Sequence, residues 1–361
     1  MNESEQVDRS PAGVRHSRWG LYLPVVLLAL LVAGWSVFWF SARARALDTV
    51  ELWLAREAAE GRRWSCPQRA VGGFPFRFEL RCENATFTGE TDIGPATGEL
   101  KRFLAVSQVY RPQHVILEVE GPLVARSTTT GASLTLDWRS FDASVVISGD
   151  LPERVAVSVT EPTLTVSAPD SPEGSFKAEA MELHARQTPE RAGAYDLALD
   201  LRKASVPELD ALLATSDAAD MTLRATVSDA EVLARGATPA RLEAWRERNG
   251  AVELTRLALV KGPQSLEASG RLGIDALHRP EGTIEASVAG LEGLLARFGL
   301  GGNGLGGLIA GGLSVLGGGR ADAPEAPGAG APGMTRLPPI RFTDGRILLG
   351  PFQIGTLSPL R

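Results

Sequence analysis

The clearest pattern along the chain is an apolar run near its start, from Leu21 to Phe40, that contains no charged residue. About 20 residues of this kind can cross a hydrocarbon core of ~30 Å as a single helix. Aromatic residues stand at its entrance and its exit, Trp19 and Tyr22 on one side and Trp39 on the other. Rings of this type favour the headgroup level of a membrane. The pattern therefore predicts a transmembrane helix over residues 21–40.

The basic residues around this run bear on its orientation, because loops rich in Lys and Arg stay in the cytoplasm. Three arginines precede the run and two closely follow it: Arg9, Arg15, Arg18, Arg43 and Arg45. We expect residues 1–20 to be cytoplasmic and the long remainder to be exported. The alternative is a cleaved signal peptide, since Ala42-Arg43-Ala44 resembles a small-residue cleavage site. A secretory apolar region usually spans about 7–15 residues, whereas this one is longer and ends in bulky aromatics, which favours an uncleaved anchor.

A helical period follows the apolar run. Apolar residues recur at three- and four-residue spacing through Leu47, Val50, Leu54 and Ala58, opposite charged positions. This spacing is typical of an amphipathic helix, and Gly61 ends it. We predict a juxtamembrane helix over residues 44–63 that continues from the membrane segment or leaves it after a short kink.

Beyond about Val106 the pattern changes to alternation of apolar and polar residues in short runs separated by Pro, Gly and Asp. The runs are 115–120, 133–138, 143–148, 155–159, 163–166, 176–180, 195–199, 222–227, 252–260 and 265–272. Strict alternation places apolar side chains on one face of a strand and polar ones on the other. The expected fold is mainly β (α+β): an N-terminal transmembrane helix, then a long curved antiparallel sheet with a few short helices.

Three segments interrupt the alternation with helical spacing, at 206–214, 239–248 and 291–298. Residues 299–333 are rich in Gly and then Pro, and we interpret them as a flexible linker or lid, because each Gly loses extra backbone entropy on ordering. The last unit, 334–361, contains Asp344-Gly345, the strongest hairpin signal in the chain. The exported β-rich domain is thus expected over residues 64–298.

Only two cysteines occur in the chain, Cys66 and Cys82. In an exported protein such a pair indicates a disulfide, because the compartment is oxidising. The alternative is a pair of metal ligands, which would need further ligands, and no His lies near either cysteine. Between them Phe74, Phe76 and Phe78 alternate, which predicts a strand with the three rings on one face.

Composition and motifs narrow the function classes. The net charge is −6 and the basic residues are scattered, so we expect no nucleic-acid partner. The motif G-x-G-x-x-G occurs at 302–307 inside the Gly-rich segment, without the strand and helix that a dinucleotide site requires. The four histidines, His16, His114, His184 and His278, are far apart in the sequence. We therefore predict no catalytic, cofactor-binding or metal-binding residue and no enzyme activity, and name only Cys66 and Cys82 as site residues.

The cysteine module and the tail carry a resemblance. The sequences Trp64-Ser65-Cys66-Pro67 and Gly72-Gly73-Phe74-Pro75-Phe76-Arg77, the second cysteine, and the tail from Asp344 to Pro351 resemble the bacterial domain of unknown function 2125 family. That family brings no established activity. More distantly, 269–275 and 282–288 resemble the paired strands of AsmA-like envelope proteins. This likeness implies a single N-terminal anchor and an extended sheet whose apolar groove handles lipid.

These observations lead to two functional expectations. The first is a protein of the bacterial inner membrane, with its C-terminal domain in the periplasm, that binds or shields an apolar, lipid-like ligand on its sheet for envelope maintenance. The second is a non-catalytic structural or assembly factor that binds envelope proteins through the edges of the sheet. In both cases the expected partner is the inner membrane, together with either a lipid or an envelope protein, and no cofactor is expected.

Overall fold

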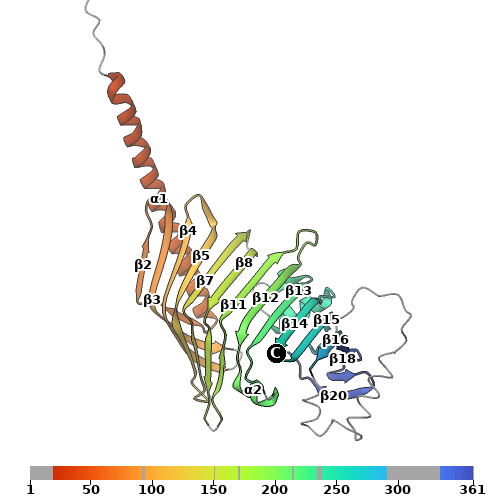
Figure 1. Ribbon diagram of the computed structural model, residues 1–361. Helices are drawn as coiled ribbons and strands as arrows, with labels where there is room; N and C mark the ends of the chain where they lie inside the picture. Colours follow the sequence, from red (N-terminus) through yellow and green to blue (C-terminus); the bar gives the residue numbers. More distant parts are fainter. Residues whose placement is uncertain are drawn as a thin grey trace, which may run out of the picture. The chain divides into compact units, whose positions relative to one another are not determined.

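The computed structural model describes residues 19–91, 94–149, 151–169, 171–213, 215–233, 238–290 and 334–360. Strands make up 56% and helices 20% of the structure, so the expected fold class, mainly β with one long N-terminal helix and a few short ones, is confirmed. The chain divides into two compact units at Leu52 and Trp53. Figure 1 shows the long helix α1 and the strands of the sheet.

Helix α1 spans Trp19–Ala59. Its segment from Tyr22 onward is long and apolar enough to cross a membrane. The two helical segments expected at 21–40 and 44–63 therefore form one continuous helix. The helix ends at Ala59, and Gly61 follows with a φ of 80°, a backbone conformation that favours glycine.

The second unit contains one antiparallel sheet of 20 strands within the described residues. Its strands are β1 (Arg63–Ser65), β2 (Gln68–Gly72), β3 (Arg77–Thr91), β4 (Gly94–Gln108), β5 (Arg111–Ser127), β6 (Ser133–Asp137), β7 (Ser140–Ser148), β8 (Leu151–Thr160), β9 (Thr163–Ser167), β10 (Gly174–Lys177), β11 (Ala180–Gln187), β12 (Tyr195–Ala204), β13 (Ala219–Val227), β14 (Val252–Lys261), β15 (Gln264–Ile274), β16 (Pro280–Ala289), β17 (Thr335–Arg336), β18 (Ile340–Thr343), β19 (Arg346–Leu349) and β20 (Phe352–Thr356).

The order of the main sheet follows from the pairings: β2, β3, β4, β5, β7, β8, β11, β12, β13, β14, β15, β16, β18, β19, β20. Strand β1 pairs beside β2 on β3, and β17 pairs beside β18 on β16. The far half of β5 carries a branch of β6, β9 and β10. Strands neighbouring in sequence are mostly neighbours in space, as in a meander, and Figure 1 shows them side by side along a curved sheet.

Short helices lie in the connections of the sheet: α2 (Pro207–Leu213), the 3₁₀ turn η1 (Ala230–Val232) and α3 (Pro239–Glu247). Helix α2 is fixed by Lys261, which is 1% exposed and whose Nζ lies 2.6 Å from Asp210 Oδ1. On α3 the buried Trp245 donates from Nε1 to the Ser228 carbonyl at 2.6 Å. Helices at 206–214 and 239–248 were expected from the sequence, and these two agree within a few residues.

Three further expectations can be compared with the structure. Phe74 and Phe76 do not share a strand face with Phe78, because residues 73–76 form a turn closed by the Arg77 N–H on the Gly73 carbonyl at 3.0 Å, and β3 begins only at Arg77. The expected strand at 176–180 is divided between β10 and β11. The hairpin at Asp344-Gly345 is confirmed, since Thr343 pairs with Arg346. Residues 1–18, the helix at 291–298, the motif at 302–307 and the segment 299–333 lie outside the described residues.

Candidate functional site: the apolar face and the crease

One face of the sheet is apolar from β3 to β16. The residues that face one another along the central row, strand by strand from β3 to β16, are all aliphatic. They are Leu80, Ala105, Leu117, Ala143, Val157, Leu183, Leu199, Leu223, Leu257, Ala268 and Ala286. The next row on the same face is also apolar: Cys82, Phe103, Val119, Phe141, Val159, Met181, Leu201, Met221, Leu259, Leu266 and Val288. We call these two rows the apolar face.

The apolar face is only partly covered. In the central row Ala143, Ala268 and Ala286 are buried, whereas Ala105, every leucine and Val157 keep part of their surface exposed. The compact core among the described residues is small, formed by Ala178, Ala204 and Ala219 with Phe176, Leu201 and Leu259 packed against them. A closed sandwich or barrel buries such leucines between two layers. Here the sheet is open, and its apolar face can contact a further apolar body.

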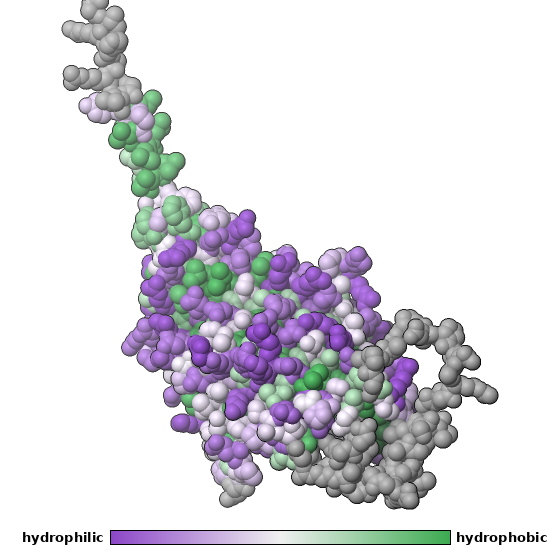
Figure 2. All heavy atoms as spheres, in the orientation of Figure 1, coloured by the Kyte–Doolittle hydropathy of each residue, from purple (hydrophilic) through white to green (hydrophobic). Residues whose placement is uncertain are grey.

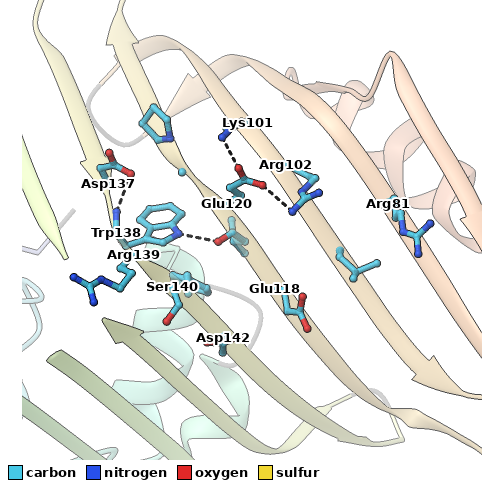
Figure 3. A pocket seen from close by; sticks show the side chains of 15 residues that line it. Arg81, Lys101, Arg102, Glu118, Glu120, Asp137, Trp138, Arg139, Ser140 and Asp142 are labelled. Atoms are coloured by element: carbon cyan, nitrogen blue, oxygen red, sulfur yellow. Dashed lines mark hydrogen bonds and ion pairs between the residues drawn. The ribbon is translucent and has the colours of Figure 1, made fainter. Parts of the chain in front are cut away.

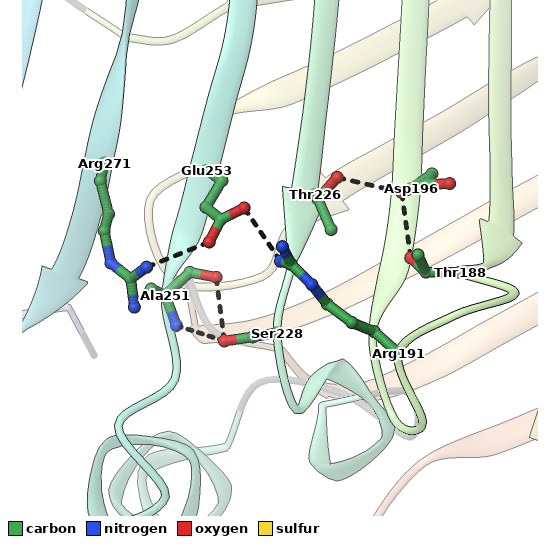
Figure 4. Close-up of polar contacts among 8 residues, drawn as sticks. All are labelled: Thr188, Arg191, Asp196, Thr226, Ser228, Ala251, Glu253 and Arg271. Carbon is green, nitrogen blue, oxygen red and sulfur yellow. Dashed lines mark hydrogen bonds and ion pairs between the residues drawn. The ribbon is translucent and has the colours of Figure 1, made fainter.

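The opposite face of the sheet is polar and bonded to itself. The Arg224 guanidinium makes two hydrogen bonds to the Asp200 carboxylate, at 2.7 and 2.9 Å. Glu253 holds both Arg191 and Arg271, at 2.9 and 3.0 Å (Figure 4). These pairs link side chains of neighbouring strands and loops, so this face is satisfied without a ligand.

Asp196 also links neighbouring segments on this polar face. Its Oδ1 accepts hydrogen bonds from the hydroxyls of Thr188 and Thr226, both at 3.0 Å (Figure 4). Burial opposes ionisation of Asp196, but these bonds and the one from Arg186 outweigh it and lower the pKa of the carboxyl group. The carboxylate therefore stays charged and fixes the β11–β12 connection to β13.

A line of irregular residues crosses the strands from β3 to β12. It consists of Asn84, Lys101, Gly121-Pro122, Trp138-Arg139, Glu161-Pro162, Ala178-Glu179 and Lys203. We call this line the crease. Asn84, Glu161 and Lys203 have φ angles of 54°, 50° and 49°, the left-handed region. Aligned bulges bend a sheet and shift its alternation by one residue.

Ion pairs accompany the crease on several strands. Arg102 lies 2.8 Å from Glu120, whose carboxylate also binds Lys101. Arg139 pairs with Glu161 at 2.6 Å. The hydrogen bond from Lys101, followed by the charge of Arg102, lowers the pKa of Glu120. All these side chains are largely exposed, so they add little to stability and more to the polarity of the surface.

A hollow of about 970 Å³ opens at the crease, between β3 and β7 (Figure 3). Trp138 is its aromatic wall: the indole Nε1 donates to the Val119 carbonyl at 2.8 Å, and a side chain on Gly121 would meet the ring at 3.4 Å. The charged residues that line it are equal in number of each sign: Arg81, Lys101, Arg102 and Arg139, with Glu118, Glu120, Asp137 and Asp142. With no excess of either charge, the hollow has no preference for an anion or a cation.

The only site residues named from the sequence, Cys66 and Cys82, form a disulfide with 2.01 Å between the sulfurs. It joins the segment before β2 to β3, and Cys82 itself belongs to the apolar face. On the other face of β3 the buried Glu79 forms ion pairs with Arg77 and Arg81, at 2.5 Å each. The Trp64 ring stacks on Phe87 at 4.6 Å and on Trp53 at 6.0 Å. The module thus closes one edge of the sheet.

The described histidines do not come together. His114 Nε2 lies 2.9 Å from the Ser144 hydroxyl, and His278 Nε2 lies 2.9 Å from Glu243. Within the described residues no carboxylate is shown hydrogen-bonded to His114, as an orienting acid would be in a triad. The described chain also contains no cluster of three potential metal ligands. The absence of enzyme activity, of a cofactor and of a metal stays a prediction.

The sequence did not reveal the crease or its hollow, because the crease residues share no residue type. The signal that was available is a break in alternation: Leu136 pairs with Leu164 and Phe141 pairs with Val159, so each lies in an apolar row, yet the two residues are five positions apart, an odd spacing. The same break occurs between Val159 and Leu164. A shift of this kind, repeated in consecutive strands, indicates a bulge at the same level in each.

Taken together, the fold defines a class: an open antiparallel sheet with one apolar face, preceded by a helix that is long and apolar enough to cross a membrane. Figure 2 shows the continuous apolar surface of the outer part of α1, and a largely hydrophilic surface with small apolar patches over the sheet on the side in view. The chain belongs to the family described as uncharacterized protein conserved in bacteria (DUF2125), whose model matches residues 39–358. No curated protein matches the chain. The likeness to AsmA-like proteins stays a prediction.

Proposed function

We propose that this chain is a single-pass protein of the bacterial inner membrane that binds or shields an apolar, lipid-like ligand on the apolar face of its sheet. The observation that carries the proposal is the partial exposure of the leucines in the central row of the apolar face, across the strands from β3 to β14. Apolar surface left in water costs about 25 cal/mol per Å². A lipid chain laid across the rows would remove that cost along its length.

The energetics favour exchange with a bilayer. Moving an acyl chain from water onto an apolar surface is favourable by about 0.8 kcal/mol per CH₂ group. An acyl chain in a bilayer is already out of water, so its transfer from the bilayer to the sheet does not gain this free energy again. A sheet that offers comparable apolar contact accepts the chain at little net cost. Reversible shielding of lipid is therefore easier for this fold than tight, permanent binding.

The orientation and compartment are part of the same proposal. The arginines before the anchor favour a cytoplasmic N-terminus, and with that orientation the sheet would lie in the periplasm. The Cys66–Cys82 disulfide supports an oxidising compartment. On this proposal the protein acts in envelope maintenance, without catalysis or cofactor.

The test is site-specific photocrosslinking of the full chain in the membrane of the bacteria that express it. A benzophenone amino acid at Leu199 lies on the apolar face, and one at the adjacent Ala198 lies on the polar face of the same strand β12. The proposal expects lipid adducts, identified by mass spectrometry, at Leu199 and far fewer at Ala198. Equal yields at the two positions, or none at either, would refute it.

The second candidate function is a structural or assembly factor that binds envelope proteins at a sheet edge. The observation in its favour is the free edge of β20, which pairs only with β19 among the described strands. On this strand Phe352 is 63% exposed and Ile354 is 58% exposed. An edge of this kind can accept a strand from another chain. A benzophenone at Phe352 would then give a stoichiometric protein adduct, while Leu199 would give no lipid.

A further inference from the structure

Exposed apolar side chains gather at one end of the sheet. Phe74 and Phe76 occupy the turn between β2 and β3 and are 49% and 64% exposed, and Tyr110, in the turn between β4 and β5, is 65% exposed. Ile147, next to the end of β7, is 39% exposed. We call these four residues the apolar rim. Single exposed apolar residues are common on proteins, but a group on adjacent turns indicates a contact surface.

The register places these turns next to one another. Arg77 pairs with Gln108, and Gln108 pairs with Arg111, so the β2–β3 and β4–β5 turns lie side by side. The Val109 N–H donates to the Phe76 carbonyl at 3.0 Å and joins the two turns directly. On β7, Val146 pairs with His114 of β5, so Ile147 follows at the same end.

The opposite end of β5 is polar. The turn that leaves β5 at Ser127 consists of Thr128, Thr129, Thr130 and Gly131, all exposed. Thr128 bonds to the Pro95 carbonyl at 3.2 Å, and Ser127 to Thr129 at 3.1 Å. The two ends of β5 therefore differ, with exposed apolar side chains at its start and exposed threonines after its end.

Basic residues stand at the base of the rim. Arg77 and Arg111 begin the two strands that leave these turns, and the Arg77 side chain is 61% exposed although its guanidinium binds Glu79. Aromatic rings flanked by arginine are typical of the level at which a membrane surface meets water. The turn that carries Phe74 and Phe76 is closed by the hydrogen bond from the Arg77 N–H to the Gly73 carbonyl, so this amide keeps its partner when the rings enter the bilayer.

We propose that the apolar rim contacts the surface of a phospholipid bilayer, with Phe74, Phe76 and Tyr110 at the level of the lipid headgroups. A bilayer is the apolar body tethered to this chain by α1, and the arginines match the negative charge of bacterial phospholipid phosphates. The contact would present one end of the sheet to the membrane. It does not depend on whether the apolar face carries a lipid.

The test uses the full chain in nanodiscs of phosphatidylethanolamine and phosphatidylglycerol. Because the chain's two cysteines are joined in a disulfide, a single added cysteine can be spin-labelled alone. Tyr110→Cys reports on the rim, and Thr130→Cys, at the polar end, is the matched control. We expect the label at 110 to collide several-fold more with oxygen, relative to a water-soluble nickel complex, than the label at 130.

Two results would overturn the inference. A label at 110 with the same water-dominated accessibility as the label at 130 would mean that the rim stays in solvent. A label at 110 that neither reagent reaches would mean that protein covers the rim. As a second variant, Phe74→Ser/Phe76→Ser should shift the label at 110 toward the reading at 130, with the disulfide intact as evidence of folding. Lipid crosslinking at Leu199 is measured separately, so either proposal can fail without the other.

Discussion

Removing the disulfide between Cys66 and Cys82 is the most direct test of how the edge of the sheet is stabilised. Cys82 is completely buried in β3, and the bond ties the segment before β2 to it. We consider the double variant Cys66→Ala/Cys82→Ala, which leaves no unpaired thiol. Alanine keeps β3 regular and removes only the crosslink and two sulfur atoms.

The magnitude follows from the size of the closed loop. The cysteines are 16 residues apart, and in the chain-entropy model a loop of this size stabilises the folded state by about 3 kcal/mol. For a folded unit of several hundred residues, each kcal/mol shifts the Tm by about 2 °C. The double variant should therefore melt roughly 6 °C lower than the oxidised protein.

The assay is thermal unfolding of the full chain in detergent micelles, followed by the circular dichroism of the strands. Four samples are needed: the natural chain and the double variant, each with and without reductant. The natural chain should lose Tm on reduction and approach the variant, and reductant should not change the variant. Hydrogen exchange should show the largest loss of protection in β2 and β3.

The reasoning would be wrong if the oxidised natural chain and the double variant melted within one degree of each other. That result would mean that the crosslink does not restrict the unfolded chain, or that the cysteine module unfolds before the rest of the sheet. A fall in the Tm of the double variant on reduction would show instead that the reductant acts elsewhere.

Three further predictions concern stability and can be measured by urea unfolding in micelles. Gly121→Ala would place a Cβ 2.7 Å from the Asp137 carboxylate and should lower the free energy of unfolding by about 1–3 kcal/mol. The control Gly98→Ala, with its nearest neighbour at 3.5 Å, should leave that free energy unchanged or raise it by up to about 1 kcal/mol. Equal effects of the two changes would contradict the close packing at the crease. Lys261→Ala breaks a buried ion pair and should cost about 3–5 kcal/mol, while Lys101→Ala, at an exposed pair, should leave the midpoint almost unchanged. Hydrogen bonds from Arg246 and then His278 lower the pKa of Glu243 to about 2, so the stability that this carboxylate contributes is complete above about pH 4.5 and is lost as the pH falls toward 2. The natural chain should therefore be more stable than Glu243→Gln at pH 5, and the difference should shrink by pH 3. A difference that is independent of pH would argue against the ion pair.

Much of the secondary structure could be predicted because local patterns specify it. The alternation at 195–199 and 222–227 lies within β12 and β13, and Asp344-Gly345 is the turn of β18 and β19, with φ angles of 51° and 72° at its two residues. The strand expected through Phe74 and Phe76 was wrong, since alternation of rings alone does not distinguish a strand from a turn that contains proline. The same turn places both rings in the apolar rim.

The apolar face could be expected in kind but not in arrangement. Each strand by itself shows which side is apolar, but all strands share nearly the same pattern, so many pairings would satisfy it. Only the structure shows that Leu183 faces Leu199 and that Leu199 faces Leu223. The partial exposure of these leucines also depends on what lies over them, and no local pattern encodes that.

By itself, the sequence determined the apolar helix at the start of the chain, the two faces of the strands and the pair of cysteines that forms the disulfide, because each depends on residues close together or on a single pair of cysteines. The tertiary structure decided the strand order, the crease, the burial of Lys261 and the hydrogen bond from Val109 to Phe76 that joins two turns of the apolar rim. These depend on contacts between distant segments, whose choice rests on register and packing across the whole sheet. The proposed lipid-binding face and membrane rim both follow from that second set.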